Sequence, residues 1–169
     1  MNRKVRVILA VLALVAAFAC AFGAWKLYEL AQLEKMDQAV WDAWCASYSD
    51  DAPAYLDAID RETYYVLEEI EKGDPYVLTV TVYGVDLGGK LRETDPAQFP
   101  NTDDEQVLND YLLKLLEESE YTEVQTFLYA WPEDGGYRIQ FSDTFVDAMT
   151  GMLMTYAREM VEEVVGGAQ

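Results

Sequence analysis

The chain has 169 residues, of which 51% are hydrophobic, and it carries 31 acidic residues against 12 basic ones. This length fits an N-terminal apolar segment followed by one domain of roughly 140 residues, and the hydrophobic content excludes a disordered chain. The formal net charge of −19 disfavours nucleic-acid binding, because an acidic surface repels phosphate backbones.

The absence of histidine limits the chemistry that the chain can carry. Without histidine the sequence lacks the usual zinc ligand, the usual base at neutral pH and every Ser-His or Cys-His pair. Cys20 and Cys45 would lie ~37 Å apart on one continuous helix, too far for a disulfide. The acidic run Asp103 to Glu105 lacks EF-hand spacing and fits the first turn of a helix. We therefore predict no metal site and no cofactor.

A basic N-terminus precedes a long apolar segment. Arg3, Lys4 and Arg6 come first, and no residue from Val7 to Trp25 is charged. As a helix this run spans ~28 Å, enough for the hydrocarbon core of a bilayer. The positive-inside rule keeps the N-terminus in the cytoplasm and places the rest of the chain outside. We predict that residues 1–25 are a cytoplasmic tip and a transmembrane signal anchor, with Val5–Trp25 crossing the cell membrane once.

Two other interpretations of this segment stay open. The triplet Ala17-Phe18-Ala19 resembles the cleavage site of a secretory signal peptide, which would be removed. The stretch Ala17 to Cys20 resembles a degenerate lipobox, in which Cys20 would become the lipidated first residue. All three interpretations place the following domain outside the cytoplasm.

Residues 26–61 are predicted to form two juxtamembrane helices. The stretch Lys26–Tyr48 contains no Gly or Pro and spaces its apolar residues helically, so the anchor should continue as one helix. The residue types of Ser49 to Asp51 are typical of an N-cap and predict a short helix over residues 52–60.

An aromatic face lies on the first of these helices. Trp41, Trp44 and Tyr48 are spaced so that they share one side of the helix. This face either docks on the core of the domain or is an exposed surface for a partner. Cys45 beside it is either buried or available to cross-link two copies of the chain.

Residues 62–165 are predicted to form an α+β domain built on two β-hairpins. The turns of these hairpins are Gly73-Asp74-Pro75 and Pro132–Gly136. The predicted strands are Tyr76–Tyr83, Glu123–Trp131 and Tyr137–Phe141. Residues 62–72 combine strand formers at one end with helix formers at the other, and a hairpin with Tyr76–Tyr83 is the simplest interpretation. Residues 84–100 between the hairpins are rich in Gly, Asp and Pro, which predicts a loop.

Two helices complete the predicted domain. One begins at Thr102 to Glu105, where acidic side chains favour the positive end of the helix dipole. The other is capped by Ser142 and Asp143 and precedes a short tail, residues 166–169. Its single apolar face consists of Phe145, Met149, Met152, Leu153, Tyr156, Met160 and Val164.

The order of these elements resembles a known family. The strand Thr79-Val80-Thr81-Val82, which an Asp follows at position 86, and the stretch Asp134-Gly-Gly-Tyr-Arg-Ile139 resemble small NTF2-like (cystatin-like) domains of Gram-positive lipoproteins and membrane-anchored proteins. The resemblance implies an antiparallel sheet of two hairpins packed with helices. It implies little about function, because these motifs record turns and core positions. The chain departs from this family in two ways. Its lipobox is degenerate, and its final helix continues past Gly151.

A pocket in such a fold could hold a ligand or a substrate. Enzymes resembling ketosteroid isomerase use an Asp base and a Tyr or protonated Asp as oxyanion donor. Candidate pocket residues are Tyr83, Tyr111 and Tyr129, together with Asp86, Tyr137 and Asp143. Since chance alone places acids near tyrosines in so acidic a chain, we assign no catalytic residue.

The function predicted from the sequence is therefore a non-catalytic module of the cell envelope that binds a protein or a ligand. Its expected partners are the lipid bilayer, through Val5–Trp25, and a protein partner or a second copy of the chain. Nucleic acid is not an expected partner. The alternatives are a small pocket enzyme of the isomerase or dehydratase type, and a structural accessory subunit of a membrane complex.

Overall fold

The described residues form a four-stranded antiparallel sheet whose strands are adjacent in chain order. The computed structural model describes residues 3–47 and 52–166, with side chains from residue 20 onward except that of residue 164. The strands are β1 (Tyr64–Glu71), β2 (Tyr76–Val85), β3 (Tyr121–Glu133) and β4 (Gly136–Gln140). Because β1 pairs with β2 and β3 pairs with β4, both predicted hairpins and the α+β class are confirmed.

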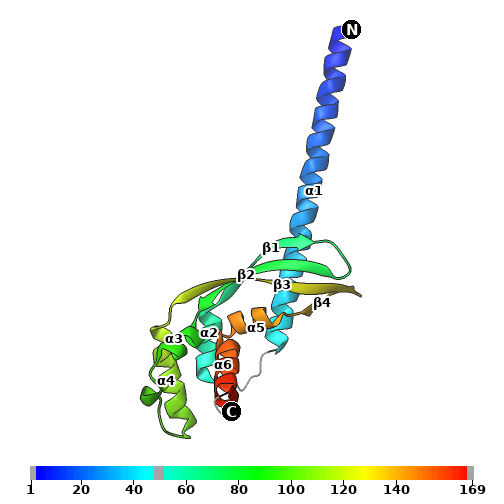
Figure 1. Cartoon of the computed structure of the whole chain (residues 1–169). Coiled ribbons are helices and arrows are strands. Elements are labelled where there is room, and N and C mark those ends of the chain that lie inside the picture. The colour runs from blue at the N-terminus through cyan, green and yellow to red at the C-terminus, as the bar shows by residue number, and fades with distance from the viewer. Residues whose placement is uncertain (1–2, 48–51, 167–169) are drawn as a thin grey trace.

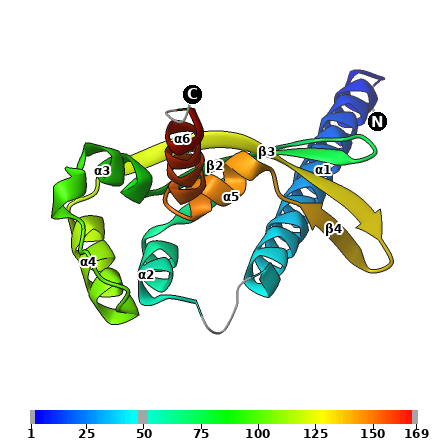
Figure 2. The same cartoon turned by 60° about the horizontal axis from the view of Figure 1, so that its bottom comes forward.

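Helices cover one side of this sheet. Figure 1 shows α2, α5 and α6 on the same side of the strands, α3 and α4 beyond the end of the sheet, and the N-terminal part of α1 extending away from the domain. The turned view of Figure 2 shows α1 passing beside β4. In the described part the helices are α1 (Arg3–Ser47), α2 (Ala54–Glu62), α3 (Leu87–Glu93), α4 (Glu105–Glu117), α5 (Asp143–Met149) and α6 (Leu153–Gly166), with a 3₁₀ turn η1 (Pro96–Gln98).

The main core lies between the sheet and two of these helices. Apolar residues alternate along β2 and β3, so every second side chain of these strands points to the same face. Phe145 of α5 is fully buried against this face. Helix α1 contributes Met36, Val40 and Trp44 to the same core. The part of α1 after Leu33 is therefore held by the domain and not by its own helix propensity.

A second, smaller core joins α2, α3 and α4 at the far end of β2. It contains Ile59 of α2, Val85 of β2 and Leu116 of α4, all buried. The α4 helix begins where predicted, and the Asp104 carboxylate caps it by accepting a hydrogen bond from the Gln106 backbone N–H at 3.0 Å.

The predicted loop over residues 84–100 is wrong in its first half. The strand β2 continues to Val85, and α3 follows at once. The Asp86 carboxylate caps α3 by accepting from the Gly89 N–H at 2.6 Å. Tertiary contact maintains this short helix, because Gly88 packs so closely on Met152 that a Cβ would overlap the Met152 carbonyl oxygen. Sequence reasoning took both glycines for loop residues, whereas Gly88 permits close packing of α3 on the residue before α6 and Gly89 leaves room for the capping Asp86 carboxylate.

The prediction of one unbroken C-terminal helix is also wrong. Helices α5 and α6 are separated at Thr150, Gly151 and Met152. Gly151 and Met152 have φ angles of 68° and 61°, a left-handed conformation that ends α5. The turned chain then lets Gly151 accept a hydrogen bond from the Gly88 N–H at 2.8 Å. The apolar spacing on both sides of Gly151 hid this helix stop.

The cap predicted for α2 falls largely outside the described residues. The predicted capping residues, Ser49 to Asp51, lie outside the described residues. Helix α2 begins at Ala54, and Pro53 occupies its N-cap position without a side-chain hydrogen bond. Proline can start a helix because the first N–H groups have no partner within the helix.

The predicted membrane anchor is described only in part. The backbone of α1 is helical from Arg3 through Trp25 to Ser47, without a break at the end of the predicted anchor. The side chains of residues 1–19 lie outside the described residues. Within the part of the chain that the structure describes, no helix is long and apolar enough to cross a bilayer.

Candidate functional site

The face of the sheet that points away from the helices carries exposed aromatic side chains. Among the described residues no helix packs on this side of β1, β2 and β3. The exposed fractions are 59% for Tyr64, 43% for Val66, 66% for Tyr121, 51% for Phe127 and 38% for Tyr129. We call this surface the open face, and it comprises these five residues and Tyr83. A group of large apolar side chains that the fold leaves uncovered is the strongest candidate for a binding surface.

Strand register brings the open face together from three strands. Tyr64 of β1 lies opposite Tyr83 of β2, and Tyr83 lies opposite Glu123 of β3. The rings of Tyr64 and Tyr83 stack with their centroids 5.2 Å apart. Further along, Phe127 lies opposite Thr79. The period of two along each strand places every second side chain of β1 to β3 on this side.

The side chain of Glu68 in β1 forms hydrogen bonds across the middle of the open face. The pairing of β1 with β2 shifts by one residue between Leu67 and Glu69. The Glu68 carboxylate accepts hydrogen bonds from the Thr81 hydroxyl at 2.6 Å and from the Gln125 amide at 3.0 Å. Such a bulge leaves the extra side chain free to turn across the neighbouring strands. Glu68 thus places a negative charge between the exposed aromatic residues.

Carboxylates make the tyrosine end of the open face electronegative. The hydrogen bond that Tyr121 donates to Glu62 is the main cause of the raised pKa of the Tyr121 hydroxyl. Partial burial, followed by the charges of Glu123 and Glu68, raises the pKa of Tyr83 above its usual 10.0. The main causes differ, but nearby carboxylates contribute to both pKa shifts, because negative charge opposes ionisation of a phenol.

The open face adjoins a groove at its α4 end. This groove has a volume of about 440 Å³ and an apolar floor that includes Val85, Leu113 and Leu116. Polar side chains at its rim are Arg61, Glu62, Glu117, Ser119 and Tyr121. Because Tyr121 and Glu62 belong both to the groove and to the electronegative end, the two surfaces are continuous.

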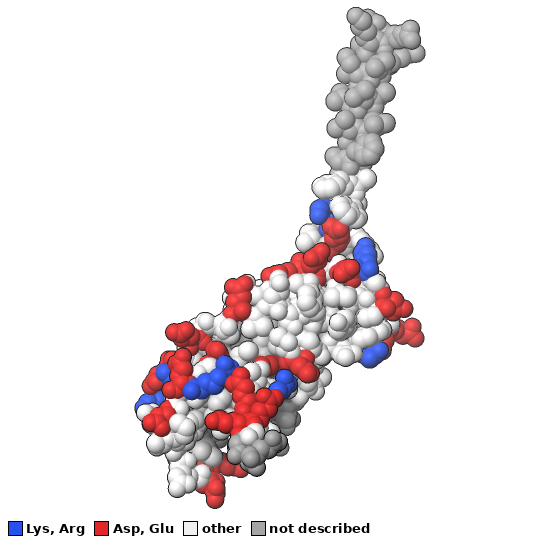
Figure 3. All heavy atoms as spheres, viewed as in Figure 1, with Lys and Arg blue, Asp and Glu red and all other residues white. Residues whose placement is uncertain are grey.

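A basic side chain, that of Arg138, lies at the opposite end of the open face. The Arg138 guanidinium lies 4.5 Å from the ring centroid of Trp131 and 2.9 Å from a Glu133 carboxylate oxygen. Its charge is therefore already paired, by a cation–π contact and an ion pair. In Figure 3 the side of the molecule next to the strands is largely uncharged and acidic residues line its upper border, whereas charged residues of both signs crowd the end formed by α3, α4 and α6, which we call the helical end.

The structure separates the aromatic residues that were predicted to share a face of α1. Trp44 is 4% exposed and docks on the core, where its rings meet Phe145 edge to face at 5.7 Å. Its indole N–H donates to the Asp60 carboxylate at 3.2 Å. Trp41 is 46% exposed and lines a shallow groove with Tyr64. Tyr48 lies outside the described residues. The docking interpretation holds for Trp44, and Trp41 lies beside the open face.

The three predicted pocket tyrosines do not meet in one pocket. Tyr83 and Tyr129 both lie on the open face, at its two ends. Tyr111 lies in the second core with its ring 5.6 Å from that of Phe99, and its buried hydroxyl has no hydrogen-bond partner within the described part of the chain. Sequence reasoning missed Tyr64, Val66, Tyr121 and Phe127. The signal was present for Phe127, since Val124, Thr126 and Leu128 alternate with it along the strand.

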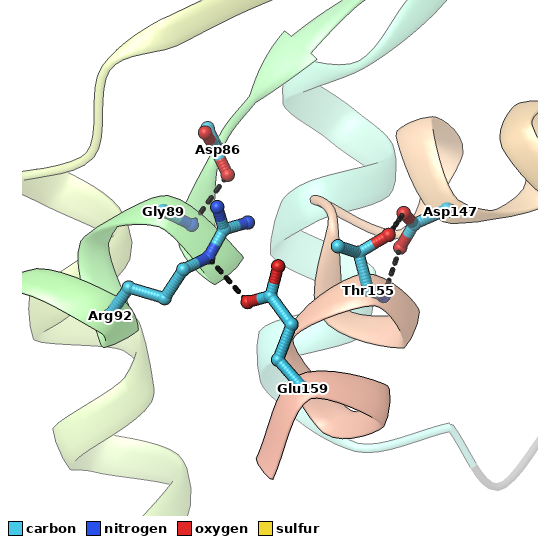
Figure 4. A network of polar contacts seen from close by, with 6 residues as sticks. All are labelled: Asp86, Gly89, Arg92, Asp147, Thr155 and Glu159. Atoms are coloured by element: carbon cyan, nitrogen blue, oxygen red, sulfur yellow. Dashed lines mark hydrogen bonds and ion pairs between the residues drawn. The ribbon is translucent and has the colours of Figure 1, made fainter. Parts of the chain in front are cut away.

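The buried carboxylate of the described chain has a structural role. Asp147 is 6% exposed, and one of its oxygens accepts a hydrogen bond from the Thr155 backbone N–H at 3.0 Å while the other accepts from the Thr155 hydroxyl. Figure 4 shows this pair joining α5 to the first turn of α6, next to the Arg92–Glu159 ion pair that joins α3 to α6. Its partner is not a tyrosine, so Asp147 does not form the carboxyl–tyrosine pair that an isomerase-type site requires.

The remaining candidates are placed as follows. Cys20 and Cys45 are both exposed and unpaired within the described residues. Asp86 and Asp143 lie at helix N-termini, where Asp86 is the cap of α3. In the described part of the chain, no group of three or more Cys, Asp or Glu side chains is placed so as to hold a metal ion.

The chain matches no family model, no curated protein and no solved structure. A functional proposal therefore depends on the surface itself.

Proposed function

We propose that this protein is a membrane-anchored module outside the cytoplasm that binds a protein partner through the open face of its sheet. The observation that carries the proposal is the exposure of Tyr64, Tyr121 and Phe127 on a sheet face that no described helix covers. Aromatic side chains dominate the energetics of protein interfaces because each can bury a large area at a small entropic cost. Exposing them to water has no benefit for the folded chain itself.

The proposed anchor is supported by residues on both sides of the predicted membrane boundary. The run from Val7 to Trp25 contains no charge, and three basic residues precede it. In the described part of α1, Phe22, Trp25 and Leu27 are 59%, 50% and 69% exposed. Side chains of this kind favour the interface of a bilayer over water. A continuous α1 would then hold the domain at a fixed distance from the membrane, since its residues from Met36 onward pack into the core.

The family resemblance enters the proposal at the level of architecture. An antiparallel sheet of two hairpins with helices on one side fits the NTF2-like (cystatin-like) arrangement that the sequence resembles. Membership would account for a domain that presents a bare sheet face. It would not by itself identify a partner.

Site-specific photocrosslinking in intact cells tests the proposal. A photoreactive amino acid replaces Phe127 on the open face or, as the control, the exposed Gln106 on α4. We expect a covalent adduct to a protein from position 127 and none from position 106, because only the first position lies in the interface. Equal labelling from both positions, or no adduct from position 127, would contradict the proposal.

Protease treatment of the same cells tests the location of the domain. If the chain is anchored with its domain outside, protease added to cells with a permeable outer layer should digest the domain and spare a cytoplasmic control protein. A domain that resists digestion until the membrane is broken open would overturn the proposed topology.

A further inference from the structure

Acidic residues outnumber basic ones in the strands that form the open face. Strands β1 to β4 and their two hairpin turns contain only Lys72 and Arg138 as basic residues. Their acidic residues are Glu68, Glu69, Glu71, Asp74, Glu123, Glu133 and Asp134. Arg138 is already engaged by Glu133 and Trp131, so it offers little positive charge to a partner. A partner of the open face therefore meets a negative surface.

The negative charge is concentrated where the aromatic rings are. Glu123 lies directly opposite Tyr83, whose ring stacks on Tyr64. Glu62 accepts the hydroxyl hydrogen bond of Tyr121. The electron-rich faces of tyrosine rings attract cations, and adjacent carboxylates add a direct electrostatic attraction. Aromatic rings flanked by carboxylates are suited to a Lys or Arg side chain.

The same charges argue against two other occupants. If two copies of the chain met through their open faces, the glutamates of one copy would face those of the other, and like charges across an interface are unfavourable. An anionic lipid surface is repelled for the same reason. A positively charged polypeptide is the partner whose charge complements this face.

We propose that the open face binds a positively charged polypeptide segment, with a Lys or Arg side chain over the Tyr64–Tyr83 pair between Glu62 and Glu123. An apolar side chain of the same segment enters the groove between Tyr121 and Leu116, whose floor is apolar. The rim of this groove carries two carboxylates, Glu62 and Glu117, and one cation, Arg61, so the groove takes the apolar part of the segment and not its basic side chain. This inference rests on the proposed function, since it assumes that the open face is an interaction surface, and it adds the chemistry of the partner.

A binding assay with defined peptides tests the inference. The full chain is placed in discs of zwitterionic phosphatidylcholine, which do not attract a cationic peptide by charge. The probe is a fluorescent peptide of repeated Gly-Leu-Lys-Ser units, and its control has Gln in place of each Lys. We expect the Lys peptide to bind at least about tenfold more tightly than the Gln peptide, and added salt to remove the difference by screening.

Matched charge variants distinguish a local site from general acidity. The double variant Glu62→Gln with Glu123→Gln removes two charges from the open face, and each Gln can still accept a hydrogen bond. The control, Glu93→Gln with Glu105→Gln, removes two exposed charges from the helical end. We expect about a threefold to tenfold loss of affinity for the Lys peptide in the first variant and less than about twofold in the second. Circular dichroism checks that both variants are folded.

Three results would overturn the inference. They are equal affinity for the Lys and Gln peptides, equal loss in the two double variants, and a crosslinked adduct from position 127 that has twice the mass of the chain. The first two leave the proposed function intact if position 127 still forms an adduct to another protein in cells. Failure to form any adduct there removes the proposed function itself.

Discussion

The two faces of the sheet are built from the same strands and meet different surroundings. On one face, Leu78, Val80 and Leu128 are completely buried under α1 and α5. On the other, Phe127 lies next in sequence to Leu128 and is half exposed. The difference shows that hydrophobic character alone does not decide which side chains form a core. Which side chains form the core depends on where the helices pack, and the apolar residues that no helix covers form the open face.

The test with the largest expected effect on stability replaces one phenylalanine on each side of the sheet by alanine. Phe145 is fully buried, stacks on Phe141 at 5.1 Å and meets Trp44 edge to face. We expect Phe145→Ala to lower the free energy of unfolding by about 3–5 kcal/mol, because it leaves a cavity in the core. Phe127→Ala should change it by less than about 1 kcal/mol. Urea unfolding of the full chain in detergent micelles measures both values.

Comparable losses in the two variants would show that the open face is a packed surface in the native protein, for example within an oligomer. In that event the proposed partner surface would have to be abandoned.

Two glycines in different surroundings provide a second test, with an intermediate expected effect on stability. Gly88 of α3 touches the Met152 backbone, whereas nothing lies within 4 Å of a Cβ added at Gly136 of β4. We expect Gly88→Ala to destabilise the protein by about 1–3 kcal/mol, since backbone has to move to admit the methyl group. Gly136→Ala should be close to neutral, and thermal unfolding compares the two.

If Gly88→Ala were neutral or stabilising, α3 and α6 would not be packed as tightly as the structure has them. The helical end of the molecule would then be a looser region than the sheet.

The smallest expected effect concerns a tyrosine on the helix-covered face. The Tyr65 hydroxyl donates to the Asp37 carbonyl oxygen at 3.0 Å, and burial, followed by the charge of Asp37, raises its pKa above 10.0. Because the folded chain holds this proton more tightly than the unfolded chain, the resulting stability is complete below pH 10.0 and is lost as the pH rises toward the folded-state pKa.

Replacing this tyrosine isolates its contribution. Tyr65→Phe should cost about 1 kcal/mol at neutral pH through the lost hydrogen bond and should show a shallower loss of stability in alkali. Urea unfolding at neutral pH and above pH 10.0 measures the difference. Parallel pH profiles for the two proteins would show that the Tyr65 proton is not held by the fold.

Part of the fold was predictable because its signals are local. The turn residues at Gly73 and Gly135 and the alternating apolar residues of β2 specify two hairpins without reference to the rest of the chain. The helix over residues 105–117 was predictable for the same reason, since its cap and its apolar spacing lie within one segment.

Other parts depend on contacts between distant segments. The first turn of helix α3 contains two glycines that sequence alone assigns to a loop, and the helix is maintained by contact with the backbone of Met152. The end of α5 at Gly151 was hidden by apolar spacing that continues through it. The candidate site was found only in part, because Tyr83 and Tyr129 were chosen as pocket residues and not as members of one face.

The sequence by itself determined the hairpins, the α+β class, the acidity of the domain and an apolar N-terminal segment, because each depends on residue type and on spacing along a short stretch. Only the tertiary structure decided that Trp44 is core while Trp41 is exposed, and that Tyr64, Tyr83, Tyr121 and Phe127 share one uncovered face. The physical reason is that the side of a sheet that becomes surface depends on the path of helices far away in the chain. No residue pattern within a strand specifies that path.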